Sequence, residues 1–324
     1  MITIFKKNDL LNVLLLLPYT ILLRLYSLVN PQAYQVQDSD SFLSTYIFSN
    51  LITSPITQAI VAIALVYGHA LLINHVVNKN RIYQRPSSLA GMTYILLVSC
   101  IQEFQQLTPA LIGLSFLILT VFSIFNTYKQ TNAVKAITNS ALNASVASIV
   151  YPPYSIIIVA LLIGLGILRS FGTKEKLQFL TSWFVMLWVF GSFLFFLGVL
   201  DWGFWNQVGL VGTLSELWSL DQNSYVLLGV TAVLIFIVIS NYYNYKKKKA
   251  IEIRKKIDFF YWMLLMGFVS LLLFKNLESQ HLIVLCMPIA VFVSMSWLLI
   301  RQPGYAEIFH FSALGLIFYN LFYL

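Results

Sequence analysis

Two carboxylates follow the first long apolar segment of the chain, and their spacing suggests chemistry. Asp38 and Asp40 occur in the sequence Gln37-Asp-Ser-Asp-Ser41. In an extended loop, residues two apart project to the same face, so both carboxylates can approach one ligand or one divalent cation. The alternative is structural: a solvated loop in which Asp40 or Ser41 caps the helix that follows.

A third carboxylate, Glu103, lies among glutamines at the end of a later apolar segment, beside Gln102, Gln105 and Gln106. A carboxylate at membrane depth is costly and tends to face the interior of a helix bundle or an aqueous cavity. The cost falls at the membrane boundary. Glu103 is therefore either a functional carboxylate or an interfacial one.

Three basic groups lie near these acids in the predicted arrangement. Arg24 falls inside the first apolar segment, and Lys275 and His281 bracket a short loop near the C-terminal end. A guanidinium binds phosphate in a bidentate manner, so together the three side chains suit an anionic lipid headgroup. The alternative is that Arg24 and Lys275 pair with carboxylates such as Asp38 or Glu278.

Other familiar chemistries find no support in the sequence. His69 and His75 are six residues apart and do not share a helical face well, which disfavours a metal site. Cys100 and Cys286 lie in separate apolar segments, so they indicate neither a disulfide framework nor a metal site. The chain shows no glycine-rich phosphate loop and no Gly-x-Ser-x-Gly motif, which excludes the chemistry of common soluble enzymes.

The elements that must position these residues are membrane-spanning helices. Of 324 residues, 59% are hydrophobic and only 10% are charged, whereas soluble proteins carry about 25% charged residues. The mean hydropathy is +0.80. These values exclude a soluble domain, a disordered chain and nucleic-acid binding through basic tracts. They predict an all-α polytopic membrane protein, residues 1–324 forming a single integral membrane domain with membrane lipids as partners.

Apolar segments long enough to cross a bilayer, about 20 residues each, define the predicted spans. The segments 88–104 and 134–150 are the most polar of them and need shelter inside a bundle. A further apolar pattern with helical spacing, within 42–52, predicts a short interfacial helix after the first span. We expect eleven spans, near 10–29, 57–77, 88–104, 107–127, 134–150, 153–170, 179–200, 223–243, 259–275, 283–300 and 308–323.

The basic residues predict the orientation, because Lys and Arg gather on the cytoplasmic side of membrane proteins. With a cytoplasmic N-terminus and an external C-terminus, every Lys and Arg except Arg24 and Lys275 falls on the inner side. The net charge of +8 is then mostly a matter of topology. The same orientation places Asp38, Asp40 and Glu103 outside.

Three features together resemble the GT-C superfamily of multi-spanning glycosyltransferases. They are the acidic pair before the interfacial helix, the polar segment Asn139–Ile149 that ends in Tyr151-Pro-Pro-Tyr154, and the sequence His281-Leu-Ile-Val-Leu-Cys-Met-Pro-Ile289. The last is similar to the Arg/His-Tyr-Leu-x-Pro-x-x-Pro segment that opens a late span in that superfamily. Pro288 matches its second proline, and Leu285 stands where the first is expected. The whole chain also resembles polytopic inner-membrane proteins of Bacteroidota that are grouped as a domain of unknown function.

The GT-C resemblance implies a polyprenyl-phosphate-linked sugar donor, reached from the outer leaflet of a bacterial inner membrane. It implies that Asp38 or Asp40 acts as catalytic base or as ligand to a divalent cation, with Glu103 as a second carboxylate. It also implies that basic residues hold the donor phosphate, a role that Arg24, Lys275 or His281 match by location.

Two other functions are open at this stage. A transporter or flippase for a lipid-linked or small anionic solute would use the same polar residues to line a path. It would need polar groups that continue to the cytoplasmic side, and the segment Asn139–Ser148 with His69 and Asn74 offers some. A non-catalytic scaffold subunit would present the tryptophan-rich segment 201–222 to a partner.

Overall fold

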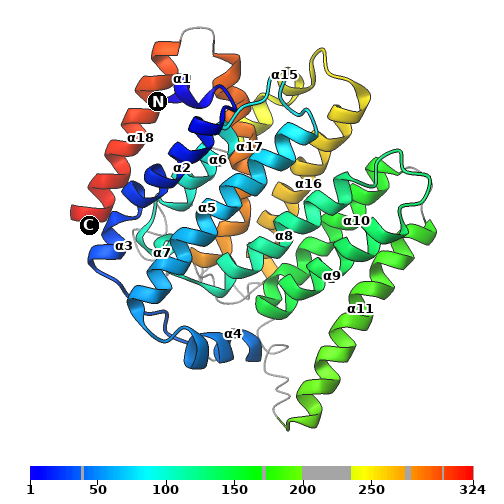
Figure 1. Ribbon diagram of the computed structural model, residues 1–324. Coiled ribbons are helices and arrows are strands. Elements are labelled where there is room, and N and C mark those ends of the chain that lie inside the picture. Colours follow the sequence, from blue (N-terminus) through cyan, green and yellow to red (C-terminus); the bar gives the residue numbers. More distant parts are fainter. Residues whose placement is uncertain (38–39, 170–172, 199–234, 274–278, 301–302, 324) are drawn as a thin grey trace.

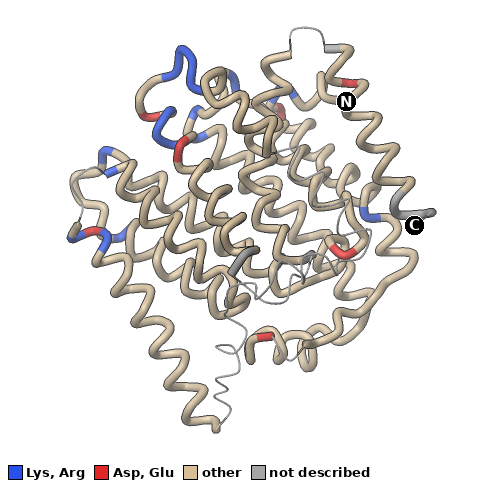
Figure 2. The backbone as a smooth tube through the Cα atoms, turned by 180° about the vertical axis from the view of Figure 1, so that it is seen from behind, with Lys and Arg blue, Asp and Glu red and all other residues tan. Residues whose placement is uncertain are grey.

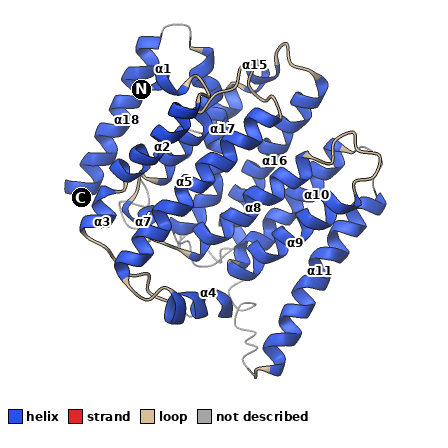
Figure 3. Cartoon of the chain, viewed as in Figure 1, coloured by secondary structure: helices blue, strands red, loops and turns tan. Residues whose placement is uncertain are grey.

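The computed structural model describes residues 1–37, 40–169, 173–198, 235–273, 279–300 and 303–323 (Figure 1). Within these ranges the chain is helical and has no β-strand, which confirms the all-α prediction (Figure 3). Most of the predicted span 223–243 lies outside the described residues, as does the end of 179–200.

Among the described residues, three helical segments are long and apolar enough to cross a membrane, namely Pro55–Lys79, Thr173–Phe196 and Gln280–Leu299. Shorter apolar helices add to these, including Leu10–Leu23 and Pro109–Phe125. The composition of these helices agrees with a membrane protein. The larger number of about eleven spans and the orientation of the termini remain predictions.

The helices form one bundle of unequal members, and several of them are too short to cross a bilayer alone. In chain order they are α1 (Ile2–Phe5), α2 (Leu10–Leu23), α3 (Leu25–Val29), α4 (Phe42–Tyr46), the π-helical turn η1 (Ile47–Leu51), α5 (Pro55–Lys79), α6 (Leu89–Val98), α7 (Gln102–Gln105), α8 (Pro109–Phe125), α9 (Val134–Val150), the 3-10 turn η2 (Pro152–Ile156), α10 (Ile157–Leu168), α11 (Thr173–Phe196), α15 (Tyr242–Lys246), α16 (Ile251–Leu273), the 3-10 turn η3 (Ser279–Leu282), α17 (Ile283–Leu299) and α18 (Pro303–Tyr323).

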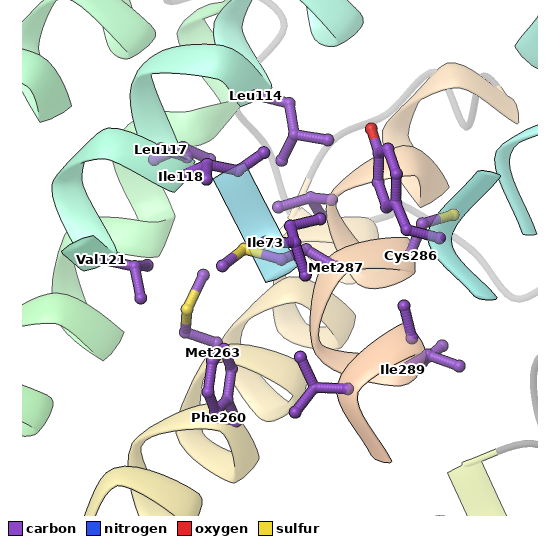
Figure 4. Close-up of a cluster of buried hydrophobic side chains, with 14 of the residues drawn as sticks. Ile73, Leu114, Leu117, Ile118, Val121, Phe260, Met263, Cys286, Met287 and Ile289 are labelled. Carbon is purple, nitrogen blue, oxygen red and sulfur yellow. The ribbon is translucent and has the colours of Figure 1, made fainter. Parts of the chain in front are cut away.

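Helix α17 lies at the centre of the bundle. In the most apolar stretch of Gln280–Leu299, 78% of the residues are buried, against 11% in that of α11, whose C-terminal end projects from the bundle (Figure 1). Ile73 of α5, Leu114 of α8, Met263 of α16 and Met287 of α17 meet in one apolar cluster (Figure 4). Because protein surrounds α17, the turn η3 at its start is held inside the molecule.

Helix α9 shows how a polar segment is accommodated in this bundle. It packs against α8 and α11, and its buried residues include the small Ser140, Ala144 and Ser148; small side chains let helices approach closely. The hydroxyl of Ser140 donates to the carbonyl of Ile137, and that of Ser148 to the carbonyl of Ala144. The prediction of a helix over 134–150 is confirmed. Its serine hydroxyls can lie inside the bundle because carbonyls of the same helix accept their hydrogen bonds.

Two predicted helices are interrupted. The segment 10–29 breaks at Arg24, whose backbone leaves helical geometry with φ −108° and ψ 17°. The segment 88–104 ends as a helix at Val98 and resumes only as the single turn α7. Both predictions of one continuous helix were wrong, and the two breaks lie beside each other in space because Arg24 bonds to the second one.

The short helix predicted within 42–52 is present as α4 and η1. Ser41 begins it: its hydroxyl oxygen accepts a hydrogen bond from the Ser44 backbone N–H at 3.2 Å. Of the two candidate caps, Ser41 therefore fills the role. The same hydroxyl donates to the carbonyl of Val150 at 3.0 Å, which ties the start of α4 to the end of α9.

Charge is distributed unevenly along the bundle. Lys and Arg gather at the end of the molecule that holds the N-terminus and α15 (Figure 2). Few of them lie toward the opposite end, which carries α4 and which we call the α4 end (Figure 1). The first loop (residues 30–41) and α7 lie on the side of the α4 end.

Candidate functional site

The first loop holds one of the predicted catalytic carboxylates in a defined position. The Tyr34 hydroxyl donates to Asp40 and lies 3.0 Å from each carboxylate oxygen. The Gln37 backbone N–H donates to Asp40 Oδ2 at 2.9 Å. Partial burial raises the pKa of Asp40 above its usual value, and these two hydrogen bonds oppose the rise. Asp38 lies outside the described residues.

Arg24 is fully buried and binds backbone carbonyls. Its Nη1 donates to the carbonyl of Gln105 at 3.0 Å, and its Nη2 donates to those of Val98 and Phe104 at 3.2 and 2.7 Å. Val98 is the last residue of α6, and Phe104 and Gln105 are the last two of α7. Arg24 therefore supplies donors to carbonyls at helix ends, which have no partner inside their own helix. A role in holding a lipid phosphate stays a prediction.

Helix α7 presents Glu103 to the exterior, while its glutamines turn inward. Glu103 is exposed, and Gln105 is buried. The Gln105 amide nitrogen donates to the carbonyls of Leu23 and Ser99, at 3.1 and 3.3 Å. Gln102 donates to the Tyr26 hydroxyl at 3.4 Å. These contacts attach α7 to the break between α2 and α3.

The third part of the site is the turn η3, which packs against α7. His281 of this turn is buried, and its ring lies 5.4 Å from that of Tyr151 between centroids, in an edge-to-face arrangement. Tyr151 in turn contacts Tyr154, whose hydroxyl donates to the carbonyl of Ala110 at 2.8 Å. The Tyr-Pro-Pro-Tyr turn thus supports His281. Lys275 lies outside the described residues.

Two adjoining cavities lie between the first loop and α7, and they share Gln32 and Gln106. The larger, which we call the vestibule, has a volume of about 680 Å³ and is open to the exterior. The smaller, the inner pocket, has a volume of about 10 Å³, room for about one water molecule. The vestibule is lined by Gln32, Ala33, Tyr34, Gln35, Gln37 and Gln106, and the inner pocket by Tyr26, Ser27, Asn30, Gln32, Ala59, Gln102, Gln105, Gln106 and Leu107.

A hydrogen bond joins the two residues that line both cavities: the Gln106 amide nitrogen donates to Gln32 Oε1 at 2.7 Å. Both side chains are on the protein surface or only half-buried. An exposed amide pair of this kind contributes little net stability, because water replaces its hydrogen bond readily.

The structure brings the predicted residues to one region without making them line one cavity. Asp40 binds two residues of the vestibule, Tyr34 and Gln37. Arg24 and Glu103 flank α7, and His281 lies on η3 against the same helix. None of these four described residues lines either cavity.

Sequence reasoning missed the amide side chains that form the walls. The available signal was their density, because Gln32, Gln35 and Gln37 share one loop, and Gln102, Gln105 and Gln106 share another segment. Only the structure shows that the two groups face each other. In the described part of the chain, His, Cys, Asp and Glu form no group of three that suits a metal; a divalent cation at Asp38 and Asp40 stays a prediction.

His69 lies deeper in the bundle and is fully bonded. Its Nδ1 is 2.8 Å from the Tyr94 hydroxyl, and its Nε2 is 2.7 Å from the Ser115 hydroxyl. A neutral imidazole satisfies both, since one nitrogen donates and the other accepts. Three helices, α5, α6 and α8, are joined by this group. Its role is therefore explained by packing.

Comparison of the chain with protein-family models, with characterised proteins and with solved structures found no match.

Proposed function

We propose that this chain is a GT-C-like glycosyltransferase of a bacterial inner membrane, which takes its sugar from a polyprenyl-phosphate-linked donor on the outer face. The observation that carries the proposal is the position of Asp40. Its carboxylate accepts hydrogen bonds from two groups of the amide-lined vestibule, the Tyr34 hydroxyl and the Gln37 backbone.

The walls of the vestibule suit a carbohydrate. Each glutamine amide offers an acceptor oxygen and two N–H donors, so Gln32, Gln35 and Gln106 match the mixed donor and acceptor pattern of sugar hydroxyls. Tyr34 adds an aromatic surface; its ring lies 4.6 Å from that of Phe48. A volume of about 680 Å³ accommodates a sugar unit.

Asp40 is the proposed general base. An acceptor hydroxyl attacks the anomeric carbon of the donor, the bond from that carbon to the phosphate oxygen breaks, and the hydroxyl proton passes to Asp40. The base must be ionised, and burial that raises the pKa of Asp40 makes it a stronger base while Tyr34 and Gln37 stabilise its charge. Asp38 is the predicted alternative on the same loop.

The polyprenyl phosphate that leaves gains negative charge, which nearby cations stabilise. Lys275 and His281 are the residues proposed for this role. Arg24 acts on the site from a distance, since it holds the last carbonyl of α6 and the last two carbonyls of α7 and so positions Glu103, the proposed second carboxylate.

The test is a comparison of surface glycans in cells that carry single variants. Asp40→Asn and Asp38→Asn should each be compared with the parent for glycan and for protein abundance. We expect Asp40→Asn to lower the glycan at least tenfold at normal abundance, because an amide cannot accept the proton.

Asp9→Asn serves as the matched control, because Asp9 is exposed, precedes α2 and makes no side-chain capping bond. It should leave the glycan unchanged. If both Asp38→Asn and Asp40→Asn retain the parental glycan, the chain does not transfer sugar in the way proposed. A scaffold role would then account better for the site.

A further inference from the structure

Three lysine ammonium groups surround one aromatic ring at the end of the bundle opposite the α4 end, where Lys and Arg gather (Figure 2). The Nζ atoms of Lys129, Lys255 and Lys256 lie 5.6, 5.9 and 5.5 Å from the centre of the Tyr128 ring. Tyr128 and Lys129 belong to the loop after α8, whereas the other two lysines belong to the first turns of α16. Folding therefore brings like charges together from segments that are far apart in the sequence.

The carboxylates of the described residues do not balance these three charges. Lys256 is buried and pairs with Glu252, one turn earlier in α16. The other ion pairs among the described residues involve neither Lys129 nor Lys255. The C-terminal end of α8 supplies only about half a negative charge. The ammonium groups of Lys129 and Lys255 are therefore available to an anion.

The loop that carries Tyr128 and Lys129 is held in place from both sides. Arg169 Nη1 donates to the carbonyls of Thr127 and Gln130, at 2.8 and 2.6 Å. Lys129 itself has a left-handed backbone with φ 58°, which is strained for a residue that carries a Cβ. A lysine anywhere in this loop would serve membrane orientation equally well. Orientation alone therefore does not explain a lysine at this strained position.

The cluster lies at the expected level of the lipid phosphates. Tyr128 directly follows the predicted span 107–127, and Lys255 precedes the predicted span 259–275 by about one helical turn. Tyrosine is enriched at this level of membrane proteins, and lysines next to the cytoplasmic end of a span attract anionic lipids. An acidic soluble protein would instead need charges that stand clear of the headgroups. The position of the cluster therefore favours a lipid.

We propose that Lys129 and Lys255, together with the Tyr128 hydroxyl, bind the phosphate of an anionic phospholipid such as phosphatidylglycerol. Lysine has a flexible four-carbon side chain, so both ammonium groups beside the ring can turn to one phosphate. The phosphate oxygens accept charge-assisted hydrogen bonds from them. The bound lipid links the loop after α8 to the start of α16. This site is separate from the proposed sugar site at the α4 end and does not depend on it.

The experiment measures lipid binding to the purified chain in a nonionic detergent. Phosphatidylglycerol should raise the melting temperature of the parent more than phosphatidylcholine does at the same concentration, because a ligand of the folded state stabilises it. The double variant Lys129→Gln/Lys255→Gln should bind phosphatidylglycerol at least about tenfold more weakly in native mass spectrometry. It should also lose the additional rise in melting temperature.

The matched control is Lys7→Gln/Lys247→Gln, which removes the same charge from two exposed positions and should bind phosphatidylglycerol as the parent does. Lys129→Arg/Lys255→Arg keeps both charges and should retain most of the affinity. Lys129→Gly gives a readout of opposite signs. It should raise the melting temperature without lipid, because glycine adopts the left-handed backbone without strain, and should weaken lipid binding.

Three outcomes would overturn the proposal. Equal stabilisation of the parent by the two lipids would mean that the headgroup charge is not recognised. Equal loss of affinity in Lys129→Gln/Lys255→Gln and in Lys7→Gln/Lys247→Gln would indicate general attraction to a basic surface. Displacement of phosphatidylglycerol by millimolar inorganic phosphate would indicate a site for a soluble anion. None of these results bears on sugar transfer, which the aspartate variants test separately.

Discussion

At the scale of single residues, Arg24 shows how a buried charged side chain can bind backbone carbonyls. The ends of α6 and α7 leave carbonyls without helical partners, and Arg24 donates to those of Val98, Phe104 and Gln105. A guanidinium carries five N–H donors in a fixed plane, so one side chain can serve several acceptors. The sequence shows that Arg24 lies inside a predicted span. It does not show which carbonyls Arg24 binds, because every residue carries a backbone carbonyl.

Replacing Arg24 by Met should therefore destabilise the protein. Three carbonyls would stay buried without donors, at about 1–3 kcal/mol each, and removal of a buried charge offsets part of this. We expect a net loss of about 3 kcal/mol, seen as a lower melting temperature in detergent. Arg24→Lys should fall between the two, since an ammonium reaches fewer acceptors. Lys247→Met, at an exposed position, is the control, and equal melting of all three would refute the structural role.

The pH dependence of stability provides a second test at this scale. Burial raises the pKa of Asp40 in the folded protein above the unfolded value of about 3.9. At pH values between the unfolded pKa and the higher folded pKa, the folded state binds more protons than the unfolded state. The free energy of unfolding therefore rises as the pH falls through this range. The parent should gain melting temperature relative to Asp40→Asn as the pH falls from 7 to about 4. A parent that loses melting temperature relative to the variant over this range would indicate a lowered pKa.

At the scale of elements, the sequence located most helices but misjudged their continuity. The length of their apolar segments identified α5, α8 and α17. The polar segment of α9 is also a helix, and its Ser140 hydroxyl bonds to a carbonyl of the same helix. The break after Val98 could not be foreseen, because Ser99 and Gln102 are tolerated in a helix end as well as in a loop. What decides between the two is Arg24, which lies far away in the sequence.

The packing of α10 on α16 offers a test with a built-in control. A Cβ added at Gly164 would lie 1.8 Å from Cδ2 of the buried Phe259 ring, so Gly164→Ala must displace an aromatic side chain that has little room to move. We expect a loss of about 1–3 kcal/mol in the free energy of unfolding.

Gly191 in α11 has no atom within 4 Å of an added Cβ. Gly191→Ala should therefore stabilise its helix by about 0.5–1 kcal/mol, because alanine loses less backbone entropy than glycine. Melting curves of the two variants should move in opposite directions. Equal shifts would mean that α10 and α16 do not pack as closely as described.

At the scale of the whole molecule, two independent features define the α4 end. The sequence predicts that few cations face the outer side, and the structure gathers Lys and Arg at the other end (Figure 2). The vestibule and the Asp40 loop lie on the side with few cations. The uneven distribution of Lys and Arg could be predicted, because these residues gather on the cytoplasmic side of membrane proteins. The vestibule could not, because it depends on two groups of glutamines that meet only after folding.

The last prediction concerns sidedness, on which the proposed substrate depends. Gln35 in the vestibule and Lys247 near α15 are both exposed, so a cysteine at either position is open to reagents. In intact spheroplasts, a membrane-impermeant maleimide should label Gln35→Cys and should label Lys247→Cys only after the membrane is opened. The parent gives the background, which should be low because Cys286 is buried and Cys100 half-buried. Labelling of Lys247→Cys alone in intact spheroplasts would put the vestibule in the cytosol, where no donor in the outer leaflet reaches Asp40, and sugar transfer on the outer face would then be impossible.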